Sequence, residues 1–178
     1  FQGTPYFNMY QGEIEMKAMS YLGYDASTIG NHDFDNGAAN LAKQMDHANF
    51  PFIISNYDVT DSNLANKVAP YIVFNKGKIK VGVLGFGIEL DGLESKKNYG
   101  NIIYQDPVEV ANRYARILKE DENCDIIICL SHLGYSYKSK KISDLILAEK
   151  VDNIDVIIGG HTHTFLDCPT LVQKPEKK

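Results

Sequence analysis

The sequence has no long hydrophobic run, no paired-cysteine spacing and no excess of positive charge. It contains no stretch of 18 or more apolar residues, so it predicts no membrane-spanning helix. Its cysteines, Cys124, Cys129 and Cys168, are odd in number and lack C-x-x-C spacing, which argues against a disulfide framework or a zinc ribbon. A net charge of -5 gives no general basic surface for nucleic acid or anionic lipid.

The remaining composition is that of an ordinary globular domain. The 178 residues are 44% hydrophobic and 23% charged, which is enough apolar material for one sizeable core. We find no internal repeat and no linker that would divide the chain, so we expect one domain over residues 1–178. No signal peptide is visible and the chain opens without an initiator Met, so the sequence itself does not indicate a location.

Hydrophobic periodicity predicts alternating helices and strands. Helices are expected at 11–22, 37–48, 107–121 and 142–151. Strands are expected at 24–29, 52–55 and 125–130, at 155–158, and in a hairpin over 71–86. Loops are expected at 1–10, 56–69, 87–100 and 135–141, with a frayed charged tail at 174–178. This alternation predicts an α/β sandwich with a mixed sheet.

Polar segments follow three of the apolar runs. They are GNHDFD at 30–35, SHLG at 131–134 and GGHTH at 159–163. Because functional loops lie at the strand ends of open α/β sheets, we expect one edge to gather four side chains. These are Asn31, His132, His161 and His163. Neutral imidazoles and an amide oxygen suit divalent Zn, Mn, Fe or Ni.

Taken singly, each of these residues has a simpler explanation. A lone histidine beside a strand is more often structural, and Asn31 after Gly30 can be a turn residue, so the argument depends on the combination. His161 and His163 are two residues apart, so each could bind a different metal of a pair. Asp35, three residues after His32, can hold that imidazole in one tautomer and raise its basicity.

These three segments resemble blocks of the calcineurin-like dinuclear metallophosphatases, specifically their 5′-nucleotidase branch. The similarity extends to YDA at 24–26, NIDVI at 153–157 and FQGT at 1–4. The resemblance implies a metallophosphatase-type αββα sandwich with mixed sheets, incomplete at the N-terminus. On this view residues 1–178 are a truncated N-terminal catalytic domain, and the C-terminal nucleotide-binding domain is absent.

The resemblance also implies roles for residues. Asn31, His132 and His161 would bind one of two divalent metal ions, and His163 would bind the other. His32 would be the catalytic histidine that contacts the phosphate, paired with Asp35. The implied reaction is hydrolysis of phosphate monoesters, first of all nucleoside 5′-phosphates, by a water that the metal pair activates. Asp33 receives no role, and the substrate-binding residues stay unassigned.

The sequence departs from the family pattern at the metal site. The Asp-x-His block and the bridging Asp of the family lie upstream of the FQGT motif, and no carboxylate here is an evident substitute. Asp167 lies near His163, but it is more simply a loop residue. In this family the C-terminal domain recognises the nucleotide base, so we expect no residue of this sequence to recognise it.

Other functions remain open. A 2′,3′-cyclic-nucleotide phosphodiesterase or a nucleotide-sugar hydrolase would use the same metals. Alternatively, the chain is a catalytically silent binding or assembly module that pairs with another chain through exposed sheet edges. The expected ligand is a small phosphoester and not a nucleic acid. The resemblance implies a periplasmic, cell-surface or secreted location.

Overall fold

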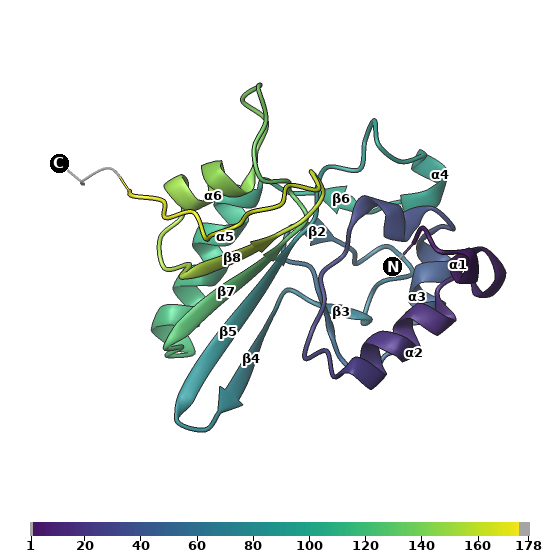
Figure 1. Ribbon diagram of the computed structural model, residues 1–178, viewed down its shortest axis with the longest axis horizontal. Coiled ribbons are helices and arrows are strands. Elements are labelled where there is room, and N and C mark those ends of the chain that lie inside the picture. The colour runs from purple at the N-terminus through teal and green to yellow at the C-terminus, as the bar shows by residue number, and fades with distance from the viewer. Residues whose placement is uncertain (1, 175–178) are drawn as a thin grey trace.

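The computed structural model describes residues 2–174, and a four-stranded mixed sheet lies at its centre (Figure 1). Its strands are, in spatial order, β4 (Tyr71–Lys76), β5 (Ile79–Phe86), β7 (Ile126–Ser131) and β8 (Val156–Gly159). The first two form the expected antiparallel hairpin, whereas β5, β7 and β8 run parallel. Phe86 pairs with Ser131 and Ser131 with Gly159, so the three parallel strands end at one level.

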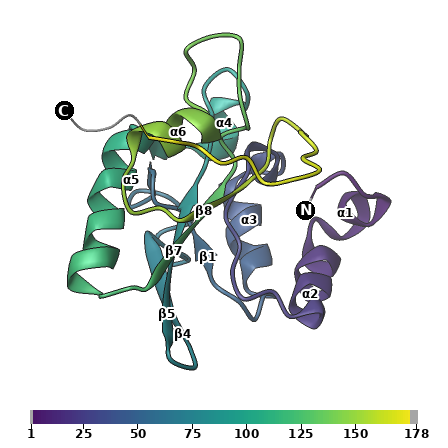
Figure 2. The same ribbon diagram turned by 60° about the vertical axis from the view of Figure 1, so that its left-hand side comes forward.

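Two helical segments cover one face of this sheet (Figure 2). They are α5 (Pro107–Arg116), which continues into a π-helical turn η2 (Ile117–Asp121), and α6 (Asp144–Lys150). Asp106 caps α5 by accepting hydrogen bonds from two backbone N–H groups, and Pro107 follows at the first helical position. The predicted helices at 107–121 and 142–151 are therefore confirmed, apart from the π turn. Cys124 and Cys129 are buried here as free thiols.

A second layer packs on the opposite side (Figures 1 and 2). It contains helices α2 (Glu13–Leu22) and α3 (Ala38–Met45) and the parallel pair β1 (Phe52–Ile53) and β3 (Val68–Ala69). A short antiparallel pair, β2 (Tyr57–Asp58) and β6 (Ile103–Tyr104), completes it. The layers have separate hydrophobic clusters. The predicted αββα class with mixed sheets is confirmed.

Hydrogen bonds from residues 55 and 56 join the two layers. The Asn56 side chain, which is 0% exposed, donates to the Gly87 carbonyl at 2.8 Å and accepts from the Gly87 N–H at 2.9 Å. The Ser55 N–H donates to the Gly85 carbonyl at 2.6 Å. The end of β5 is thus held in register with the segment after β1, close to where the functional loops begin.

Several expectations at the edges of elements were wrong. Residues 1–10, expected as loop, contain helix α1 (Pro5–Tyr10), because the Thr4 side chain caps it and Pro5 occupies the first position. The expected strand at 24–29 is reduced to a single bridge between Ser27 and Phe52. The 56–69 segment contributes β2 and β3. The 87–100 segment contains α4 (Lys96–Tyr99).

Other predictions agree with the structure only in part or lie outside what it describes. Helix α2 forms within the predicted range 11–22 and buries Met16, but Leu22 at its end is 72% exposed. Of the charged tail at 174–178, residues 175–178 lie outside the described residues. Strand β8 has no partner on its outer side within residues 2–174, and its pairing with another chain stays a prediction. Over the same residues, no helix has the length and apolar character needed to cross a bilayer.

Candidate metal and catalytic site

Two of the expected histidines follow the parallel strands directly. His132 comes after β7, and its backbone N–H donates to the carbonyl of Phe86 at the end of β5 at 2.7 Å. His161 follows β8, which ends at Gly159, after the single residue Gly160. Because these strands end at one level, both imidazoles lie at the same sheet edge, with ring centroids 5.2 Å apart. Figure 1 shows the chain after β8, in yellow, crossing this edge.

Asn31 reaches the same place from the other layer. It opens the 3-10 turn η1 (Asn31–Phe34), which follows the Ser27 bridge and belongs to no strand of the central sheet. Its side-chain Oδ1 lies 3.1 Å from His161 Nδ1, and the residue is 5% exposed. The expectation that one sheet would carry all these residues was therefore wrong, since the site lies between two layers.

Glycines allow the close approach of these segments. A Cβ atom on Gly30 would lie 2.7 to 2.9 Å from three atoms of the His132 ring, and one on Gly160 would lie 3.3 Å from His132 Nδ1. A side chain at position 30 would therefore force the His132 ring to move. The His132 ring thus packs on the backbone that precedes Asn31, which explains why glycine is needed there.

Burial keeps the central imidazoles neutral. Burial, together with the neighbouring His161 and His32, lowers the pKa of His132 to about 4. Burial also lowers the pKa of His161, followed by the effects of Lys141 and His163. Neutral imidazoles keep a lone pair for a metal ion at pH 7. Their donor chemistry, together with the Asn31 amide oxygen, fits a divalent transition metal.

His163 lies at the margin of this group. It is exposed, and its effects on the pKa values of His132 and His161 indicate that it lies near them. His161 and His163 have φ angles of 69° and 53°, a left-handed conformation that is costly for residues with a Cβ. Such conformations cluster at functional sites.

His32 and Asp35 form the expected pair at the surface. His32 Nδ1 lies 3.2 Å and 3.3 Å from the two carboxylate oxygens of Asp35. The His32 side chain is 68% exposed, whereas that of Asp35 is 25% exposed. Because Nδ1 is engaged by the carboxylate, Nε2 is the nitrogen left to meet a ligand.

Glu94 is a neighbour of this pair that the sequence patterns did not indicate. One ligand atom from each of His32, Asp35 and Glu94 lies within 4.8 Å of the others. Among residues 2–174, these three residues form the group of His, Cys, Asp or Glu side chains whose ligand atoms lie close enough together to hold a metal ion. His132 and His161 are not part of this group. No sequence pattern marks Glu94, because its position depends on the buried Ile88 and Leu90, which hold the 87–100 segment against the core.

A buried carboxyl lies behind the His132 loop. Asp144, at the start of α6, accepts a hydrogen bond from the Ser131 hydroxyl at 2.5 Å, and Ser131 Oγ accepts from the Leu133 N–H at 3.1 Å. Burial raises the pKa of Asp144 to about 6, against the lowering effect of the Ser131 hydrogen bond. This arrangement fixes the turn that carries His132.

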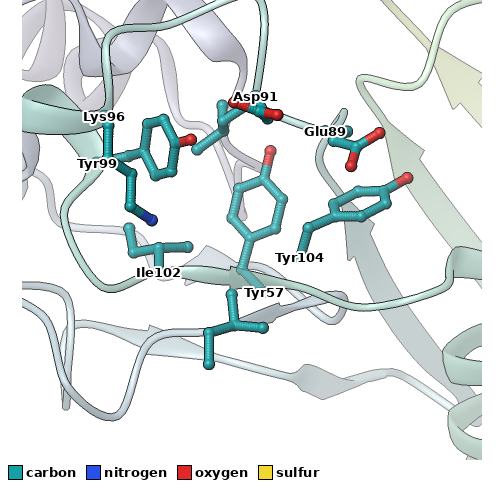
Figure 3. Close-up of a pocket in the computed structure, with 9 residues that line it drawn as sticks. Tyr57, Glu89, Asp91, Lys96, Tyr99, Ile102 and Tyr104 are labelled. Atoms are coloured by element: carbon teal, nitrogen blue, oxygen red, sulfur yellow. The ribbon is translucent and has the colours of Figure 1, made fainter.

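A cavity of about 410 Å³ opens beside η1 (Figure 3). Its walls include Tyr57, Tyr99 and Tyr104, and the carboxylates of Glu89 and Asp91 lie among them. The Tyr57 ring lies 6.4 Å from that of Phe34 in η1, which places the cavity next to this turn. Its size is that of a small-molecule site.

Comparison with known proteins agrees with this architecture. The calcineurin-like phosphoesterase family matches residues 1–165. A snake venom 5′-nucleotidase from Gloydius brevicauda is 37% identical over 171 residues, which cover 93% of this chain and 28% of that protein.

Solved structures give the same result. A 5′-nucleotidase precursor from Thermus thermophilus superposes with a TM-score of 0.84 at 34% identity, over 99% of this chain and 34% of that one. The NAD nucleotidase of Haemophilus influenzae superposes with a TM-score of 0.78 at 30% identity, over 92% of this chain and 28% of that one. The chain thus spans about a third or less of the length of these relatives.

Proposed function

Because this chain belongs to the calcineurin-like phosphoesterase family, we propose that it carries much of the active site of an enzyme that hydrolyses nucleotide phosphomonoesters. The preferred substrates on this proposal are nucleoside 5′-phosphates. Support comes from the similarity to 5′-nucleotidases over nearly the whole chain. The observation that carries the proposal is the convergence of Asn31, His132 and His161 beside the His32–Asp35 pair.

Calcineurin-like phosphoesterases use divalent metal ions. We propose that Asn31, His132 and His161 hold one ion, and that His163 contributes to a second. Zn, Mn, Fe and Ni all suit these donors. When bound, such a pair of ions neutralises phosphate oxygens and activates a water for attack. The absence of a carboxylate from this donor set, within residues 2–174, means that a complete site requires further ligands.

His32 would act on the phosphate itself. With Nδ1–H donated to Asp35, the imidazole has its Nε2 free to approach a phosphate oxygen. In its protonated form Nε2–H donates to that oxygen or gives its proton to the leaving alkoxide. Asp35 stabilises the imidazolium and holds the ring in one orientation.

A second reaction on the same site is hydrolysis of a phosphoanhydride, as in a dinucleotide or a nucleotide sugar. The similarity to the NAD nucleotidase favours keeping this candidate. Hydrolysis of a 2′,3′-cyclic nucleotide by the same site is a further candidate reaction, and the same panel of substrates tests it. The substrate in every case is a small phosphate ester or anhydride, and the snake venom relative supports an extracytoplasmic location.

A substrate panel tests the proposal. The protein is equilibrated with Mn²⁺ or Zn²⁺, and the products are separated by chromatography. The products sought are adenosine and phosphate from AMP, UMP and glucose 1-phosphate from UDP-glucose, AMP and nicotinamide mononucleotide from NAD, and 3′-AMP from 2′,3′-cyclic AMP. We expect AMP to give the highest kcat/KM, and His32→Ala to abolish most of it. His47→Ala is the matched control, because His47 lies near Glu13 in the second layer. No turnover of any of these would favour the silent binding module.

A further inference from the structure

The cavity beside η1 combines aromatic walls with negative charge. Figure 3 shows the Tyr57 ring between Tyr99 on one side and Tyr104 on the other. The Tyr57 and Tyr104 ring centroids are 6.2 Å apart. The carboxylates of Glu89 and Asp91 lie near the hydroxyl ends of these rings. Because the face of an aromatic ring and a carboxylate both attract positive charge, the cavity has the chemistry of a cation site.

On the Tyr99 side, an ammonium group of the protein already lies against an aromatic wall. The Lys96 Nζ lies over the Tyr99 ring, 4.5 Å from its centroid. Lys96 also lines the cavity, so this ammonium belongs to the same space as the carboxylates. The contact shows that an alkylammonium group fits against the walls of this cavity.

On the Tyr104 side, the same kinds of group lack a positive partner within residues 2–174. The Tyr104 Oη atom is buried and has no hydrogen-bond partner among these residues. Glu89, which is exposed, forms no ion pair with any of them. Burial, followed by the charge of Glu89, raises the pKa of Tyr104, so its hydroxyl is neutral and the oxygen can accept a hydrogen bond. A ligand that donates to this oxygen relieves the cost of a buried polar atom without a partner.

We propose that this cavity binds a small organic molecule that carries a primary ammonium group on an apolar body. Its N–H groups donate to the Glu89 carboxylate and to the Tyr104 oxygen. Its apolar body lies against the Tyr57 ring and the buried Ile102. Since two carboxylates face the single ammonium of Lys96, the cavity disfavours a phosphate or another anion.

Three probes of similar shape separate charge from size: phenethylammonium, phenethyl alcohol and phenylpropanoate. Each is titrated into the metal-free protein in EDTA at pH 7, and ¹H–¹³C spectra of the tyrosine rings report binding. The Tyr104 signals are assigned by their loss in Tyr104→Phe. We expect saturable shifts of Tyr57 and Tyr104 with the ammonium probe, and binding about tenfold tighter than that of the alcohol. The carboxylate probe should not bind measurably.

Two substitutions test the contacts themselves. Glu89→Gln removes the charge and keeps the size of the side chain, so it should weaken binding of the ammonium probe about tenfold. Tyr104→Phe keeps the ring and removes the hydroxyl, so it should weaken that binding about threefold. Glu120→Gln and Tyr21→Phe, both at exposed positions outside the cavity, are the matched controls and should bind as the wild type does.

The outcome does not depend on hydrolysis. The residues that line this cavity include none of the proposed metal ligands and not His32, and the titration requires neither metal nor turnover. Equal binding of the ammonium and alcohol probes, or unchanged binding in Glu89→Gln, overturns the proposal. Tighter binding of the carboxylate probe, or no binding of any probe, overturns it as well.

Discussion

At the scale of single residues, His32 and His132 should fail in different ways. His132 lies within the donor group, packed on Gly30 and next to His161, whereas His32 is exposed and bonded to Asp35. We therefore expect His32→Ala to lower turnover by roughly 10²- to 10⁴-fold with metal content near normal. His132→Ala should lower both. Metal analysis by mass spectrometry beside the activity assay checks this, and equal metal loss in the two variants would contradict the assigned roles.

Asp144 should give the protein a measurable pH dependence. Its pKa is about 6 in the folded protein and lower when unfolded, so the folded state binds the extra proton between these values. Its contribution to the free energy of unfolding is therefore fully present below about pH 4 and is lost as the pH rises through 6. The expected loss is roughly 3 kcal/mol.

Comparison of wild type with Asp144→Asn in urea at pH 4, 5, 6 and 7 isolates this effect. The variant keeps an acceptor for Ser131 but cannot ionise, and the opposite trend from His132, whose pKa is lowered, is common to both proteins. We expect the wild type to lose stability relative to the variant as the pH rises. Asp167→Asn, in an exposed segment, is the control. A difference that stays constant with pH would argue against a protonated Asp144.

At the scale of elements, apolar runs predicted the strands that end at the site. The apolar runs at 125–130 and 155–158 form β7 and β8. Short, continuous apolar runs of this kind are typical of strands in a parallel sheet. The expected strand at 24–29 forms a single bridge, since the chain turns into η1 at Asn31 immediately afterwards. Helix α1 was not predicted, because a Thr-Pro pair can begin a turn as well as a helix.

The candidate site was predicted only as far as local patterns reach. The positions of His132 and His161 follow from strand ends, and the His32–Asp35 pair follows from a spacing of three. Glu94 was not predicted, because its partner Asp35 lies 59 positions earlier and the contact depends on packing of the 87–100 segment. Such contacts arise from tertiary structure, which periodicity does not reveal.

The link between layers at Asn56 gives a prediction at this scale. Asn56→Ala would leave the N–H and the carbonyl of Gly87 without their buried partner. We expect the free energy of unfolding to fall by about 2 to 4 kcal/mol, measured in urea. Asn112→Ala is the matched control, because Asn112 is exposed on α5 and should change stability by less than about 0.5 kcal/mol. Equal effects would contradict a special role for the Asn56 contacts.

At the scale of the whole molecule, the site lies between two layers that have separate cores. His132 and His161 come from the central sheet, and Asn31 comes from the layer that contains α2 and α3. A ligand bound by all three would contact both layers of the folded protein. Such a ligand stabilises the native state by a free energy that rises with the logarithm of its concentration divided by its Kd.

The central claim is that Asn31, His132 and His161 bind one metal ion together, and calorimetric titration of the metal-free protein with Mn²⁺ or Zn²⁺ tests it most directly. Each of Asn31→Ala, His132→Ala and His161→Ala should weaken binding by about tenfold or more. Asn112→Ala and His47→Ala should leave it unchanged. If Asn31→Ala binds metal as tightly as the wild type, the two layers do not share a metal site and the account is wrong.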